Sequence, residues 1–142
     1  MIVVAVAGVL ALVAYPTFMD TVRKSRRSEA VAALAQVQQS QERWRANNAS
    51  YADDAKLTPA LPNGLGIARG TGSGLYALTI DAANANGYTA TATAVAGKSQ
   101  SHDTKCTVMR VRLDRANIQY GGCAGCVLPG GELTDPDRCW SR

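Results

Sequence analysis

The hydrophobic pattern divides the first 47 residues into two helical parts. The first 19 residues carry no charge, which is typical of a helix that lies in lipid or in a bundle of its own kind. At ~1.5 Å per residue such a helix would extend roughly 28 Å, close to the thickness of a bilayer core. Further along, apolar positions recur every three or four residues, and polar side chains such as Arg27 are expected around the other faces. The face of this amphipathic part comprises Ala30, Leu34, Val37, Gln41 and Trp44.

Two residues weaken the helix within the apolar part. Pro16 has no amide hydrogen, and its ring opposes the carbonyl of Leu12. Gly8 adds backbone freedom upstream, at a cost of about 1 kcal/mol relative to alanine. A simple kink is the alternative interpretation, because membrane helices tolerate proline where neighbouring groups satisfy the backbone. The small residues that would allow close helix packing in this part are Ala5, Ala7, Gly8, Ala11 and Ala14.

The rest of the sequence predicts a loop followed by short strands. Residues 48–74 contain prolines and glycines without a regular period, which is typical of a loop. Strand-like alternation follows at 75–81, 87–95 and 106–113, with a fourth candidate at 116–120. We therefore predict an α+β fold, in which a long N-terminal helix packs its amphipathic half on an antiparallel sheet of three or four strands.

The net charge of +4 lies mainly beside the apolar part. Residues 1–28 carry four basic residues and one acidic residue, a net charge of +3, which leaves +1 for residues 29–142. The run Arg-Lys-Ser-Arg-Arg at 23–27 is typical of a membrane surface, where anionic headgroups attract cations. The sequence thus predicts two parts: a transmembrane or filament-core helix half with a basic collar at 1–28, and a globular head at 29–142.

Three basic residues of the head are candidates for contact with nucleic-acid phosphate. Arg110 and Arg112 share one face of the strand at 106–113, and Lys105 precedes it. The nearly neutral charge of the head favours a different interpretation, a solvated sheet face whose charges discourage edge pairing. We therefore favour the solvated face and keep DNA contact at these three residues as an alternative.

The four cysteines are Cys106, Cys123, Cys126 and Cys139, and they fit an oxidising compartment. Basic residues beside a membrane span usually stay cytoplasmic, which would place the head in a reducing compartment instead. A short basic leader ahead of Met1 would resolve this conflict. Four cysteines allow three disulfide connectivities, which the spacing alone leaves open.

The Cys-Ala-Gly-Cys segment at 123–126 allows a redox or metal interpretation. A thioredoxin-type motif requires a helix start after a strand, whereas the flanking glycines and Pro129 favour a turn. A four-cysteine zinc site usually has two short-spaced pairs, and here there is one. The single histidine, His102, has no obvious cysteine or carboxylate partner. We therefore expect no enzyme, cofactor or metal site, and keep a membrane-anchored periplasmic thiol protein as a further alternative.

The opening sequence MIVVAVAGVLALVAYPTFMDTVRKSRRSEA resembles the N-terminal helix of bacterial type IV pilins. The likeness rests on a methionine-aliphatic opening followed in order by Gly8, Pro16, Phe18 and Asp20. The later sequences DTKC and Cys-Trp are similar to those of smaller pilins of the Gram-negative pilus, minor pilins included. The family's basic leader, methylated phenylalanine and early glutamate are missing, so we expect residues ahead of Met1.

The resemblance implies a ladle-shaped subunit that polymerises through its apolar half-helix. The implied partners are other pilins in a helical filament, the inner membrane before assembly, and the pilus assembly machinery. The implied location is the inner membrane and then the extracellular pilus, with the head in the periplasm or outside. The implied role is structural, in adhesion, motility or DNA uptake, with a DNA-binding competence minor pilin as the alternative. Filaments of this family also imply that the helix unwinds between Gly8 and Pro16 after assembly.

The resemblance further implies a disulfide between Cys106 and Cys139, so that residues 121–142 would form a disulfide-bonded loop. Closing a loop of roughly 30 residues stabilises a protein by about 3 to 4 kcal/mol in the chain-entropy model. Cys123 and Cys126 would then pair locally. Mapping of peptides under non-reducing conditions distinguishes this connectivity from the other two.

We predict that a charged residue in place of Ala7 or Ala11 abolishes filament assembly. The charge would lie among apolar helices, where an unpaired ionised group is strongly destabilising. Electron microscopy of cells that express Ala7→Asp or Ala11→Asp measures the outcome. Normal pili from either variant would contradict the prediction.

Overall fold

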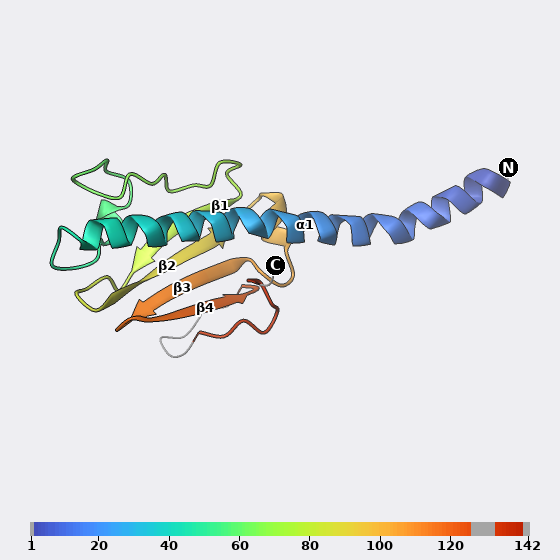
Figure 1. Cartoon of the computed structure of the whole chain (residues 1–142). Coiled ribbons are helices and arrows are strands. Elements are labelled where there is room, and N and C mark those ends of the chain that lie inside the picture. The colour runs from blue at the N-terminus through green and yellow to red at the C-terminus, as the bar shows by residue number, and fades with distance from the viewer. Residues whose placement is uncertain (1, 126–132, 141–142) are drawn as a thin grey trace.

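The computed structural model describes residues 2–125 and 133–140, with the backbone alone at residues 2 and 4–17. One long helix, α1 (Ile2–Arg45), precedes a four-stranded antiparallel sheet with the strand order β1-β2-β3-β4. Figure 1 shows that the C-terminal half of α1 lies across one face of the sheet, while the N-terminal half projects beyond it. The predicted α+β fold with a pilin-like ladle shape is confirmed.

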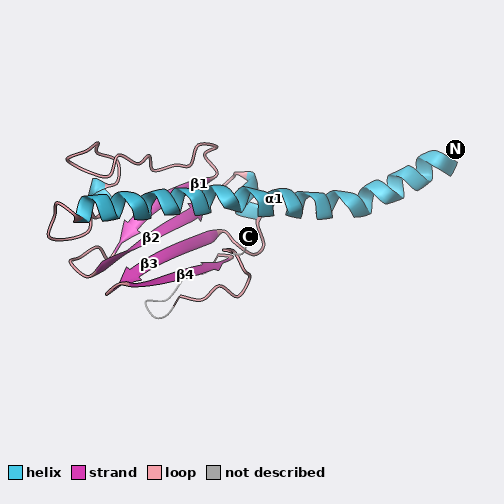
Figure 2. Ribbon diagram, viewed as in Figure 1, coloured by secondary structure: helices cyan, strands magenta, loops and turns pink. Residues whose placement is uncertain are grey.

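The four strands lie side by side in chain order, as Figure 2 shows. Each predicted strand is confirmed to within two residues, except that the fourth continues to Cys123. The antiparallel register places Ala92 opposite both Leu78 and Met109. The strands are β1 (Tyr76–Asp81), β2 (Gly87–Ala94), β3 (Val108–Asp114) and β4 (Asn117–Cys123), and two short 3-10 helices are η1 (Asp54–Lys56) and η2 (Ser99–His102).

The hydrophobic core lies between α1 and the sheet. Ala30, Leu34, Val37 and Gln41 are each at most 1% exposed, so the predicted face of α1 is the buried face, and Trp44 packs at its edge. Side chains of a strand alternate between its two faces, and alternate residues of three strands complete the core. These are Tyr76, Leu78, Ile80, Tyr88, Ala90, Ala92, Met109 and Val111.

Arg27 also belongs to the buried face of α1. The prediction that it lies among the solvated polar faces is wrong, because Arg27 is only 9% exposed. Its position, three residues before Ala30 and seven before Leu34, continues the helical spacing of that face. A guanidinium group is tolerated there because a buried carboxylate, Asp103, pairs with it.

The N-terminal half of α1 is described as backbone. The helix is continuous from Ile2 to Arg45, so Gly8 and Pro16 both lie within it. The expected unwinding concerns the filament and stays a prediction. Within the described part of the chain, none of the helices combines the length and apolarity that a membrane crossing needs. The small residues expected to pack in a filament core have side chains outside the described ones, so their role also stays a prediction: Ala5, Ala7, Gly8, Ala11 and Ala14.

The C-terminal segment packs against β4 and explains the length of that strand. The Gly122 N–H donates to the carbonyl of Thr134 at 3.1 Å, and Trp140 Nε1 donates to the carbonyl of Gly121 at 2.8 Å. A Cβ atom at Gly122 would lie 2.6 Å from the Cβ of Cys139, so this approach requires glycine. The strand therefore continues through two glycines that weaken strand propensity, and its edge is partly covered against pairing with other chains.

Gln41 fastens the end of α1 to the following loop, because its side-chain amide donates to the carbonyl of Ala52 at 2.8 Å and accepts from the N–H of Ala52 at 2.9 Å. We expect Gln41→Leu to lower the free energy of unfolding by about 2 to 4 kcal/mol, since both backbone groups would stay buried without partners. The exposed control Gln39→Leu should change it by less than about 0.5 kcal/mol. Urea denaturation measures both, and equal stability of the two variants would contradict this role.

Candidate functional site

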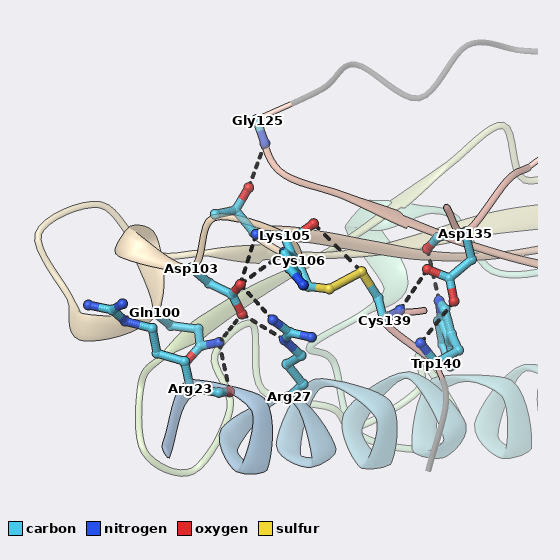
Figure 3. Close-up of a disulfide and its surroundings, with 12 residues drawn as sticks. Arg23, Arg27, Gln100, Asp103, Lys105, Cys106, Gly125, Asp135, Cys139 and Trp140 are labelled. Carbon is cyan, nitrogen blue, oxygen red and sulfur yellow. Dashed lines mark hydrogen bonds and ion pairs between the residues drawn. A yellow bond between two sulfur atoms is a disulfide. The ribbon is translucent and has the colours of Figure 1, made fainter. Parts of the chain in front are cut away.

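Asp103 connects three segments at the base of the head, the end from which the N-terminal half of α1 projects (Figure 3). Its side chain is 2% exposed and pairs with Arg27 of α1 through two N–H groups, at 2.7 and 2.8 Å. It also accepts from Gln100 of η2 at 2.9 Å. The backbone N–H groups of Lys105 and Cys106 donate to it at 3.0 and 3.1 Å. Five hydrogen bonds therefore converge on one buried carboxylate.

Two opposing effects set the pKa of Asp103. Burial by itself raises the pKa, but the hydrogen bonds from Arg27 and from the backbone of Lys105 and Cys106 outweigh burial, so the pKa lies below its ordinary value of 3.8. The carboxylate is thus ionised at neutral pH, and the buried charge of Arg27 keeps its partner. Removing one member of such a pair is far more destabilising than replacing both.

The disulfide between Cys106 and Cys139 lies beside this carboxylate, as Figure 3 shows, and confirms the predicted pairing. The backbone N–H groups of Cys139 and Trp140 donate to the carboxylate of Asp135 at 2.7 and 3.0 Å, which holds the turn that carries the second cysteine. Both cysteines are at most 3% exposed. The disulfide therefore joins the C-terminal segment to the chain just ahead of β3, with little access for solvent.

The second cysteine pair falls partly outside the described residues. Cys126 is among the residues that are not described, so its pairing with Cys123 stays a prediction. Cys123 is 8% exposed and packs with Leu133 and Val108. His102, at the end of η2, is exposed. Within residues 2–125 and 133–140 no group of three or more His, Cys, Asp or Glu side chains could hold a metal ion.

A concavity of about 640 Å³ opens at the base of the head, between α1 and the segments around Asp103 and Arg138. We call it the base pocket. Arg23 pairs with Asp20 at its rim, at 3.0 Å. The basic residues that line the pocket are Arg23, Lys24, Arg27, Lys105 and Arg138, and the acidic ones are Asp20, Asp103 and Asp137.

Two further cations lie beside the base pocket. Arg26 donates to the hydroxyl of Ser99, and Lys98 directly precedes that residue at the start of η2. With these two, the base of the head holds seven basic and three acidic residues, a net charge of +4 that equals the charge of the whole chain. The cluster at 23–27 was visible in the sequence, whereas the fold brings the other cations to it.

Arg110 and Arg112 lie on the outer face of the sheet, the face opposite α1. Arg110 Nε donates to Thr91 Oγ1 at 3.0 Å, and Arg112 Nε donates to Thr89 Oγ1 at 3.3 Å. Both threonines are at most 5% exposed. Burial lowers the pKa of Arg110, while the carboxylate of Asp81 acts in the opposite direction. Each guanidinium group is therefore held by a threonine of the neighbouring strand β2, so the two groups lie side by side.

The three residues predicted as phosphate contacts are divided between two surfaces. Lys105 lines the base pocket, whereas Arg110 and Arg112 stand on the outer face. Sequence reasoning also missed Asp103. Its local signal is an aspartate whose carboxylate accepts hydrogen bonds from the backbone N–H groups two and three residues later. Its partner in α1 lies 76 residues away, so no local pattern identifies the pair.

The family model described as "Type IV minor pilin ComP, DNA uptake sequence receptor" matches residues 16–110. The matched region runs from Pro16 of α1 through β1 and β2 to Arg110 within β3. It covers about two thirds of the 142 residues. No curated protein matches the chain.

We expect Asp103→Asn to lower the free energy of unfolding at pH 7 by about 3 to 5 kcal/mol, because Arg27 would keep a buried charge without a counter-ion. The folded-state pKa of Asp103 is depressed, so its contribution is complete above about pH 4 and is lost as the pH falls through the folded pKa. Acidification below pH 4 should therefore destabilise the native chain more than the variant. Chemical denaturation at pH 7 and pH 3 measures both effects, with exposed Asp137→Asn as the control. Equal acid sensitivity of native chain and variant would refute the assignment.

Proposed function

The chain belongs to the family of type IV minor pilins described as DNA uptake sequence receptors, and we propose that it is a pilus subunit that binds DNA for uptake. The observation that carries this proposal is the family match, which spans α1 from Pro16 and the sheet as far as Arg110. The shape supports it, because a long helix projects from a compact head (Figure 1). The role of receptor is taken from the family's description.

The projecting half of α1 supports a place in a filament. Phe18 is 65% exposed and Val3 is 80% exposed, so these apolar side chains are open to solvent in the isolated chain. A helix of this kind is stabilised when it packs against lipid or against similar helices. We therefore propose that residues 1–28 form the membrane and filament-core part, that residues 29–142 form the head, and that other pilins and the assembly machinery are the partners.

The outer face of the sheet is the surface that we propose for DNA contact. Arg110 and Arg112 stand two residues apart on this face, and Gln119 of β4 lies opposite Arg112. The planar guanidinium fork matches the geometry of phosphate oxygens, which makes arginine a favoured residue for nucleic acids. Hydroxyl and amide side chains supply further hydrogen bonds to phosphates and base edges. The outer face therefore combines charge with hydrogen-bonding groups, next to the C-terminal segment, where the N–H of Leu133 donates to Gln119 Oε1.

A purely structural role, in adhesion or motility, is the alternative within the same family. That role uses the projecting helix and the filament contacts but requires no particular chemistry on the outer face. A DNA receptor differs because its affinity for DNA depends on defined cations and decreases with salt. The two roles are separated by replacing the arginine pair, since both residues lie away from the core between α1 and the sheet.

We predict that Arg110→Gln/Arg112→Gln weakens binding of duplex DNA by roughly tenfold or more. Each lost phosphate contact should lower the slope of log affinity against log salt by about 1, so the double variant should lose about 2. Fluorescence anisotropy of the full chain with a labelled duplex, at several salt concentrations, measures both quantities.

The charge-matched control is Arg43→Gln/Lys56→Gln, which removes two exposed cations from the end of α1 and from η1. It should leave the salt slope unchanged. Equal affinity and equal slope for the arginine variant and the native chain would exclude the outer face as the DNA contact. Absence of DNA binding by the folded native chain would overturn the receptor role itself.

A further inference from the structure

The base pocket contains cations that the fold does not pair. The ammonium groups of Lys24 and Lys105 form no hydrogen bond or ion pair with the residues that the structure describes. Arg23 Nε is buried there without a hydrogen-bond partner in the described part of the chain, although the same guanidinium pairs with Asp20 through Nη1. Two exposed, unpaired ammonium groups thus border a space of about 640 Å³ and have unused capacity to bind an anion.

The pocket lies where the apolar part of α1 leaves the head. Phe18, apolar and 65% exposed, precedes Lys24 by six residues, which is about 9 Å along the helix axis. The headgroup layer of a bilayer extends about 5 to 8 Å beyond the hydrocarbon core on each side. A helix inserted as far as Phe18 would therefore place the backbone of Lys24 just beyond the outer edge of the headgroup layer, and the long lysine side chain can extend back to a lipid phosphate.

We propose that the base pocket binds the phosphate of an anionic phospholipid headgroup while the subunit waits in the membrane. The inference rests on the proposed membrane insertion of residues 1–28 and is independent of DNA binding. Lys24 reaches the phosphate from α1, and Lys105 reaches it from the segment ahead of β3. Arg26 and Lys98 face neighbouring headgroups, where each cation adds attraction to an anionic surface.

A headgroup fits the pocket better than duplex DNA does. Three acidic residues line the pocket, and Asp137 is exposed among them. Duplex DNA carries one negative charge for about every 1.7 Å of its axis, so it would meet these carboxylates as well as the lysines. A single phosphate can bind between the lysines while the carboxylates at the rim of the pocket stay solvated. The concave shape and mixed charge of the pocket therefore favour a small anion over a long polyanion.

The test compares partition of the full chain into two kinds of vesicle, phosphatidylcholine alone and phosphatidylcholine with about one third phosphatidylglycerol. The apolar helix binds both, so the ratio of the two partition coefficients isolates the headgroup contribution. We expect Lys24→Gln/Lys105→Gln to lower this ratio roughly 25-fold, about fivefold for each lysine. Flotation of the vesicles measures the ratio, and high salt should lower it for the native chain, because salt screens surface charges.

The matched control, Arg43→Gln/Lys56→Gln, removes the same charge far from the pocket and should keep the ratio of the native chain. Both lysines of the pocket are exposed, and circular dichroism verifies the fold of each variant and of the two single variants. An unchanged ratio in the lysine variant, or an equal decrease in the control, would overturn the proposal. So would a lysine variant that keeps its lipid preference and loses DNA binding, because the pocket would then be a DNA contact.

Discussion

The ion pair between Arg27 and Asp103 is the constraint on which the structure at the base of the head depends. Both charges are buried, so neither is tolerated without the other. The pair ties α1 to the segment that carries Cys106 and, through the disulfide to Cys139, to the C-terminal segment. It thereby determines where the helix leaves the head and which side chains of α1 point toward the base pocket.

The fold separates two cationic surfaces that have different shapes. The base pocket is concave, lies beside the projecting helix and mixes Lys24 and Lys105 with carboxylates. The outer face is a sheet surface on which threonines hold Arg110 and Arg112 side by side. Because the core and the whole sheet lie between α1 and the outer face, one surface can meet the membrane or the filament while the other meets DNA. Under the proposed function, this separation would allow one subunit to take its place in a filament and also bind DNA.

Local patterns were enough to predict the helix face and the strands, because Leu34 and Met109 follow the periods of a helix and a strand. The same pattern failed at Arg27, whose burial depends on a partner 76 residues away. The likeness to pilins, and not the spacing, predicted the Cys106–Cys139 disulfide. The nearly neutral charge of residues 29–142 favours a solvated face over DNA contact at Arg110, but net charge does not report how individual cations are placed. The family's description as a DNA uptake sequence receptor is the reason to propose DNA contact there, and the contact itself stays a prediction.

The most direct test of the central claim, a pilus subunit that also binds DNA, is made in cells that display pili. DNA uptake and the number of filaments are measured together in cells whose chromosomal copy is replaced by Arg110→Gln/Arg112→Gln. We expect uptake to decrease at least tenfold while filaments persist, because these arginines lie on the outer face and away from the projecting helix. Uptake at the native level, with filaments intact, would contradict it.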